Sequence, residues 1–118
     1  MSQIRDIIMK PAIFHPKARA AMKDFPKEVK KTLGDSILDL QRGITLGMPL
    51  SKPMPSVGPG VHEIRIRDRS GIYRVFYLTV SEIGILVFHA FKKTTQATPK
   101  QEIELGKKRL KELLNEEI

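Results

Sequence analysis

The spacing of apolar residues near the N-terminus predicts two consecutive helices that form a hairpin. His15-Pro16 opens the first helix, because proline suits the first helical position. Its apolar side consists of Ala18, Ala21 and Met22. Pro26 starts the second helix, and Gly43 is expected to end it. The apolar positions of this second helix recur at helical spacing, at Val29, Leu33, Ile37, Leu40 and Ile44.

Alternating or continuous apolar runs predict four strands. Ile4 to Met9 is interpreted as a short first strand. In Val61 to Arg67 the isoleucines point to one side and the charged residues to the other. Ile72 to Val80 is apolar on both faces, as in a central strand, and Ile85 to Phe91 is the last strand. Residues 68–71 and 81–84 are the turns between these last three strands.

A helix is expected to close the chain. Thr98-Pro99-Lys100-Gln101 has the pattern of a capping box with proline at the first helical position. The apolar stripe that follows consists of Ile103, Leu110, Leu113 and Leu114. Gly106 should weaken this helix by about 1 kcal/mol relative to alanine, unless it marks close packing. The order β-α-α-β-β-β-α predicts one α+β domain over residues 1–118, with the helical hairpin packed on a small antiparallel sheet.

The stretch from Thr45 to Gly60 differs from its surroundings. It contains four prolines and three glycines, so neither a helix nor a central strand can run through it. A loop of this length in a small domain is often functional or mobile, although a plain connector is an equally good interpretation.

Register places two arginines opposite each other on the predicted sheet. Every reading of the 68–71 turn pairs Arg65 with Arg74, and like charges in this position destabilise a sheet by roughly 0.2–1 kcal/mol. The second turn allows two registers, and both leave His89 and Phe91 on the face of Arg74. The opposite face collects the residues of an apolar core, namely Ile64, Ile66, Tyr73, Val75, Tyr77, Leu86, Phe88 and Ala90.

The arginine face is expected to be covered at one end only. Its apolar end consists of Phe76, Leu78, Ile85 and Val87, over which the C-terminal helix could pack. Its other end is expected to stay open and cationic, with Arg65, Arg67, Arg74, His89 and Lys93. Lys92 has the opposite parity and is expected to join from the end of the strand. This convergence predicts a binding site for an anion, although a solvated face with arginine stems covering apolar surface would look similar.

Composition agrees with an anionic partner. The chain has 21 lysines and arginines against 13 acidic residues, a net charge of +8, which favours nucleic acid, a membrane surface or an acidic protein. It has no cysteine, so it has neither disulfides nor a thiolate metal site. No apolar run has the length of a membrane span, and the N-terminus lacks the pattern of a signal peptide, so a cytoplasmic location is expected.

The cationic cluster contains residue types that could cleave RNA. The 2′-hydroxyl of RNA is a built-in nucleophile, and its attack needs a base, cations for the phosphate and an acid for the leaving oxygen. Arg74 would hold the phosphate, His89 would act as base or acid, and Lys92 or Lys93 would supply a proton. Cationic neighbours should lower the pKa of His89. The further RNA-binding candidates are Arg65, Arg67 and Lys52. No carboxylate cluster suggests a metal, so neither a metal nor another cofactor is expected.

Three stretches of the chain resemble the HigB-type, phage-derived branch of the RelE/ParE toxin superfamily. They are FPKEVKKTLGDSILDLQRG, HEIRIRDRSGIYRVFYL and LVFHAFKKTTQATPKQEIELGKKRLKEL, within 25–44, 62–79 and 85–114. The resemblance implies a RelE-like fold. It also implies that Arg74 lies where the family has a phosphate-contacting arginine, that Arg65 matches the arginine of its ExR pattern, and that Lys92 and Lys93 match its basic segment. RelE-like relatives often have a late tyrosine, whereas this chain has none after Tyr77.

The resemblance implies the toxin of a type II toxin–antitoxin pair, acting as a ribosome-dependent endoribonuclease on messenger RNA. Its partners would be messenger RNA on the ribosome and a cognate, HigA-like helix-turn-helix antitoxin. Two other functions remain open: a ParE-like gyrase inhibitor that cleaves nothing, and a non-catalytic RNA-binding module. The open cationic face with its histidine favours the endoribonuclease.

Overall fold

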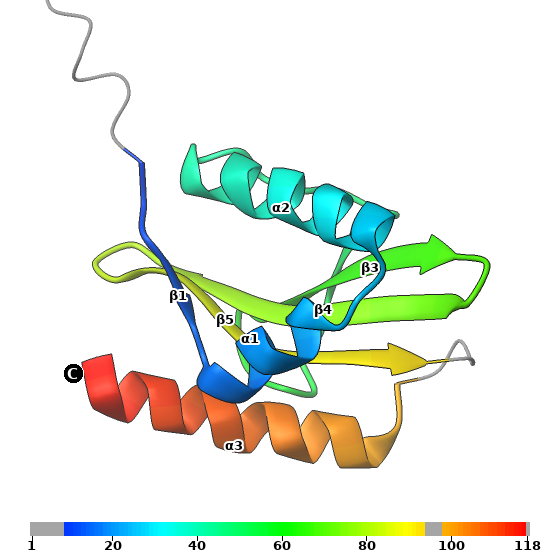
Figure 1. The fold of residues 1–118 in the computed structure, drawn as a ribbon. Helices are drawn as coiled ribbons and strands as arrows, with labels where there is room; N and C mark the ends of the chain where they lie inside the picture. The colour runs from blue at the N-terminus through cyan, green and yellow to red at the C-terminus, as the bar shows by residue number, and fades with distance from the viewer. Residues whose placement is uncertain (1–8, 94–97, 118) are drawn as a thin grey trace, which may run out of the picture.

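A five-stranded sheet between two layers of helices forms the core of the protein (Figure 1). The computed structural model describes residues 9–93 and 98–117. In chain order the elements are β1 (Ala12–Phe14), α1 (Pro16–Lys23), α2 (Lys27–Gln41), β2 (Ser51–Pro53), β3 (His62–Asp68), β4 (Gly71–Val80), β5 (Gly84–Lys93) and α3 (Lys100–Glu117). The α+β class and the N-terminal helical hairpin are therefore confirmed. None of the helices in the described ranges is long and apolar enough to cross a membrane.

The sheet is mixed, with strand order β1-β5-β4-β3-β2. β1 runs parallel to β5, with Ala12 beside Ile85, whereas the other three pairings are antiparallel. The predicted antiparallel sheet is confirmed for β2 to β5, but the parallel strand β1 was not foreseen, because its three residues are too few to show an alternating pattern. The strand predicted at residues 4–9 lies, except for Met9, outside the described residues, and Met9 itself is not in a strand.

The two predicted N-terminal helices are confirmed. The His15 ring accepts a hydrogen bond from the backbone N–H of Lys17 at 3.1 Å, and therefore caps α1. After α2, Gly43 has φ +86° and its N–H donates to the carbonyl of Leu40, so this glycine ends the helix as expected. Ile44 lies beyond that end and is 48% exposed, so its assignment to the apolar face of the helix was wrong.

The proline-rich stretch contains one short strand, β2, at the edge of the sheet. Pro53 lies in this strand, a position compatible with proline because an edge strand needs fewer backbone donors. The hydroxyls of Ser51 and Tyr77 lie 2.7 Å apart and tie β2 to the central strand. The expectation that no central strand crosses residues 45–60 is confirmed.

The predicted pairing of Arg65 with Arg74 is confirmed, whereas the second hairpin combines two registers. Phe76 faces His89, but the next residue, Tyr77, faces Val87, so Phe88 is an extra residue in β5. This bulge reverses the parity of the first half of β5, because a slip of one residue turns every side chain to the other face. Leu86 and Phe88 therefore pack under α3, and the assignment of both to the hairpin face was wrong.

The hairpin-side core lies between the sheet and the α1–α2 hairpin, and its buried residues include Val29, Leu33, Ile64, Val75, Tyr77, Ile85 and Val87. The α3-side core includes Phe76, Leu86, Phe88, Phe91, Leu110 and Leu113. α3 approaches the sheet at Gly106, where an added Cβ would lie 2.7 Å from Cδ2 of Phe76. Close packing therefore explains the glycine inside this helix.

Candidate nucleic-acid interface

Arg65, Arg67, Arg74 and Lys93 lie on the α3 side of the sheet, towards the β3–β4 turn. Arg65 and Arg74 lie in one cross-strand row with Phe91, and Arg67 lies in the next row with Ile72 and Lys93. Lys52 of β2 faces Glu63 of β3. Lys92 pairs with Tyr73 and lies on the opposite face, with its Nζ 5.8 Å from the ring centroid of Tyr73. The predicted parities of these residues are therefore confirmed.

The sequence suggested that Arg74 lies on an open surface, and this was wrong, because the residue is only 1% exposed. Its Nη1 donates hydrogen bonds at 3.0 Å both to Oε1 of Glu63 and to the hydroxyl of Thr98. The Thr98 hydroxyl in turn donates to Oε2 of Glu63 at 3.2 Å. Thr98 therefore links the start of α3 to the sheet, and Arg74 is held inside a hydrogen-bonded triad.

Glu63 makes the unfavourable arginine pair possible. This carboxylate is fully buried, and Nε of Arg65 lies 3.6 Å from the same oxygen that accepts from Arg74. One negative charge between two guanidinium groups offsets their repulsion, and charge-assisted hydrogen bonds satisfy the buried carboxylate. The paired arginines are therefore part of a compensated internal cluster, and only Arg65 extends from it to the surface.

His89 is also buried, at 2% exposure, and both of its ring nitrogens have partners. Arg109 Nη1 lies 2.7 Å from Nδ1, and because a guanidinium can only donate, Nδ1 must accept. The ring proton is therefore on Nε2, which donates to Oε1 of Glu102 at 2.7 Å. The expectation of an open histidine was wrong, because α3 supplies both partners. In this arrangement no ring nitrogen is free for a substrate.

The surroundings of His89 favour its neutral form. Burial lowers its pKa below the ordinary value of 6.5, and the charges of Arg109 and His15 act in the same direction, while Glu102 opposes them. The lowered pKa agrees with the expectation from sequence, although burial rather than the cationic neighbours is its main cause. An imidazolium would also place an N–H against the guanidinium of Arg109.

We expect His89 to make the fold sensitive to mild acid. Its pKa is lower in the folded than in the unfolded state, so its stabilising contribution is complete above about pH 6.5. That contribution is lost as the pH falls from there towards the lower folded pKa. The melting temperature should therefore decrease between pH 7.5 and 5.5, and His89→Gln should flatten this dependence. Thermal unfolding of both proteins across this range measures the effect; equal slopes would contradict it.

Two of the cations that reach the surface, Arg65 and Arg67, line a hollow beside β3. It has a volume of about 470 Å³ and is lined by Pro49, Leu50, Arg65, Arg67 and Ile72. Arg67 is exposed and Arg65 is half-buried, so two guanidinium groups border an apolar floor. Lys93 follows in the same cross-strand row as Arg67 and Ile72. Such a combination can hold phosphate oxygens at the arginines and contact a base or ribose on the floor.

Sequence reasoning missed the acidic and polar partners of the cluster. Glu63 shares the alternating face of Arg65, so strand parity already places it beside the arginines. Glu102 and Arg109 are about two helical turns apart and thus lie on one face of the last helix. Treating Thr98 as a helix cap concealed its contacts with Glu63 and Arg74. Within residues 9–93 and 98–117, no group of three or more His, Cys, Asp or Glu side chains could hold a metal ion.

Fold and surface together define a small, basic α+β domain with an arginine-lined hollow at one edge of its sheet. The model of the Gp49-like family of phage-derived proteins matches residues 20–111, and the chain belongs to this family. The family is associated with toxins of toxin–antitoxin pairs. No curated protein matches the chain.

Proposed function

We propose that this protein is the toxin of a type II toxin–antitoxin system and cleaves messenger RNA on the ribosome. The observation that carries the proposal is the hollow where Arg65 and Arg67 border an apolar floor, in a family associated broadly with toxins of toxin–antitoxin pairs. An arginine pair of this kind is suited to phosphate, because the planar guanidinium donates two parallel hydrogen bonds. The proposed partners are ribosome-bound messenger RNA and a cognate helix-turn-helix antitoxin.

In the proposed reaction the RNA supplies its own nucleophile. The 2′-hydroxyl attacks the adjacent phosphorus, the bond to the 5′-oxygen breaks, and the products are a 2′,3′-cyclic phosphate and a 5′-hydroxyl. Arg65 and Arg67 would stabilise the charge that develops on the phosphate oxygens, and this step requires no metal. Lys93, in the row of Arg67, would exchange protons with the reacting oxygens.

The buried residues would support this surface rather than contact RNA. Arg74 fixes Glu63, and Glu63 in turn limits the positions that the Arg65 guanidinium can adopt. His89 joins α3 to the sheet through Glu102 and Arg109. Preorganised donors contribute more to a transition state than mobile ones, because they need no reorganisation during the reaction.

Arg67→Gln is expected to reduce cleavage of translated messenger RNA by about 10- to 100-fold, the range for loss of one hydrogen bond to a charged group. The side chain is exposed, so the fold should not change. Arg69→Gln is the matched control. Arg69 is also exposed and its substitution removes the same charge, but Arg69 does not line the hollow. Primer extension on ribosome-bound and free transcripts gives the readout. Equal effects of the two substitutions would assign the loss to net charge alone.

A non-catalytic RNA-binding module is the second candidate, and the engagement of both ring nitrogens of His89 favours it. The same assay separates the two functions. If ribosome-bound messages stay intact while the protein still binds RNA, and Arg67→Gln weakens that binding, the protein is an RNA-binding module and not an endoribonuclease. Growth arrest with neither cleavage nor RNA binding would instead favour a gyrase inhibitor of the ParE type.

A further inference from the structure

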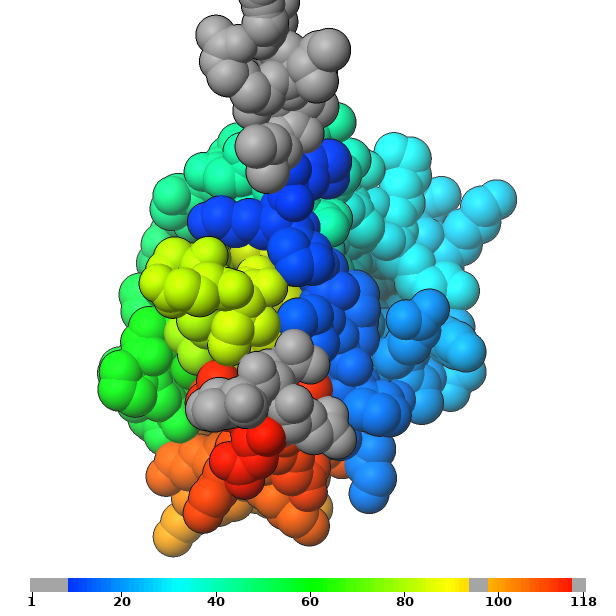
Figure 2. Space-filling view, turned by 90° about the vertical axis from the view of Figure 1, so that its left-hand side faces the viewer, coloured from blue at the N-terminus to red at the C-terminus, as the bar shows by residue number. Residues whose placement is uncertain are grey.

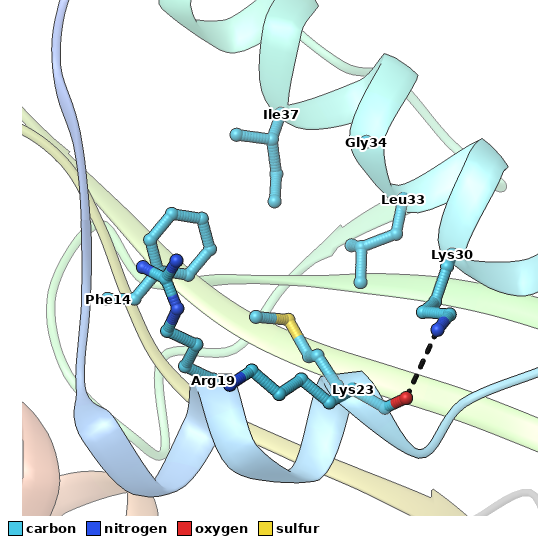
Figure 3. Close-up of a pocket in the computed structure, with 8 residues that line it drawn as sticks. Phe14, Arg19, Lys23, Lys30, Leu33, Gly34 and Ile37 are labelled. Carbon is cyan, nitrogen blue, oxygen red and sulfur yellow. Dashed lines mark hydrogen bonds between the residues drawn. The ribbon is translucent and has the colours of Figure 1, made fainter.

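A second hollow, of about 330 Å³, lies between α1 and α2 (Figure 3). Its floor is apolar: Leu33 and Ile37 extend from α2 towards α1, and Phe14 of β1 lies at one side. The hollow includes a residue of the edge strand β1, whereas the arginine-lined hollow lies beside β3, on the side of the sheet away from β1. Figure 2 shows β1 between the β4–β5 turn and the α1–α2 hairpin. A ligand in this groove would therefore leave Arg65 and Arg67 accessible.

Every charged residue that lines the groove is a cation. Arg19 and Lys23 come from α1 and Lys30 comes from α2. The guanidinium carbon of Arg19 lies 5.7 Å from the ring centroid of Phe14. The ammonium group of Lys30 donates to the backbone carbonyl of Lys23 at 3.1 Å, the dashed line in Figure 3, so it is held at the rim. An apolar floor with a cationic rim complements a ligand that is apolar in the middle and acidic at its sides.

Gly34 is an independent sign that something approaches this groove closely. It lies inside α2, where glycine costs about 0.5–1 kcal/mol relative to alanine. An added Cβ would have no atom within 4 Å, so packing within the protein does not explain the glycine. Gly106 provides the contrast, because its own neighbour is Phe76. A glycine that lines a groove and faces open space allows the backbone of another molecule to come near.

We propose that this groove receives an acidic amphipathic helix from a protein partner. Apolar residues at i, i+3 or i+4 and i+7 of that helix would contact Leu33 and Ile37, and its backbone would pass over Gly34. Flanking carboxylates would pair with Arg19, Lys23 and Lys30. A protein helix is favoured over a nucleic acid because Gly34 leaves room for a backbone to approach closely beside the apolar side chains of Leu33 and Ile37.

The test rests on the proposed function in one respect: the partner used is the cognate helix-turn-helix antitoxin, called the regulator below, that the proposed function requires. Binding of the purified proteins is measured by calorimetry. Lys30→Glu and Gly34→Trp should each weaken the complex at least tenfold. Lys31→Glu is the matched control, since Lys31 is exposed, adjacent and outside the groove, and it should change the affinity less than twofold. Both groove variants should still arrest growth, and the regulator should no longer neutralise them.

Each of the other possible results contradicts one specific part of the proposal. If the regulator binds all variants equally well, the groove is not its docking site, although the proposed partnership stands. If Lys30→Glu weakens RNA binding, or if Gly34→Trp converts a dimer to a monomer, the occupant is RNA or a second copy and the proposal is overturned.

If the regulator does not bind the protein at all, it is not the partner that the proposed function names. The groove is then tested separately with synthetic peptides. The probes are two synthetic helices that carry leucine at i, i+4 and i+7, one with glutamate and one with lysine at the flanking positions. Shifts of the Leu33 and Ile37 methyl resonances with the glutamate helix alone support the groove. Equal shifts with both helices, or shifts with neither, overturn it.

Discussion

Glu63→Gln is expected to destabilise the protein by about 3–5 kcal/mol, the cost of breaking a buried ion pair by removing one charge. The amide has nearly the same shape as the carboxylate, so the loss is electrostatic rather than steric. Arg74 would stay buried within reach of a neutral group, and Arg65 would lose the charge that offsets its repulsion with Arg74. Because Arg74 is buried, it cannot relieve this by turning towards water.

Chemical denaturation gives the free energy of unfolding for this comparison. Glu104→Gln is the control, because Glu104 is an exposed carboxylate on α3. Among the described residues its only ion pair is with Lys107, at 3.5 Å, and such surface pairs contribute about 0–1 kcal/mol. The double substitution Glu63→Met/Arg74→Met should recover most of the loss, since it removes both buried charges together. A Glu63→Gln protein as stable as Glu104→Gln would show that the cluster is not energetically coupled.

Gly106→Ala and Gly34→Ala should change stability in opposite directions, although both place alanine inside a helix. At Gly106 the new methyl group would lie within 3 Å of the buried Phe76 ring, and such overpacking costs about 1–3 kcal/mol. At Gly34 the methyl group faces open space, so the protein should gain about 0.5–1 kcal/mol from helix propensity.

Melting temperatures of the two alanine variants and the parent protein test this pair. Because the same atoms are added in both cases, helix propensity cancels and the difference reports the contact between α3 and Phe76. Phe76→Leu in the Gly106→Ala background should restore part of the loss by making room for the methyl group. Stabilisation by Gly106→Ala would mean that α3 can shift away from the sheet at low cost.

The hairpin register was predictable from sequence, but the assignment of faces along β5 was not. The turn at 68–71 fixes the pairing of Arg65 with Arg74, because each reading of that turn gives the same register. The bulge at Phe88 left no such sign, since it contains no glycine or proline and interrupts a continuous apolar run. Where every residue is apolar, polarity does not reveal which side a residue faces.

The sequence predicted which face of the sheet the candidate site residues share, but it did not predict that Arg74 and His89 are buried. Strand alternation collected Arg65, Arg67 and Arg74 on one face, and the charges suggested an open surface. Burial depended on α3, whose polar residues Glu102 and Arg109 cover His89. Such cross-element pairs join residues distant in sequence, and only the packed structure shows which polar groups meet.

The parallel pairing of β1 with β5 also has a consequence for the order of folding. Ala12 is among the first residues of the described chain to be synthesised, but its neighbour Ile85 comes late. Contacts between distant segments form slowly, because the intervening chain must first lose loop entropy. The β3–β4–β5 meander has short turns and can form first, so the N-terminal segment must wait for it. Until then the apolar side of the α1–α2 hairpin stays exposed, and this is the stage at which aggregation is most favourable.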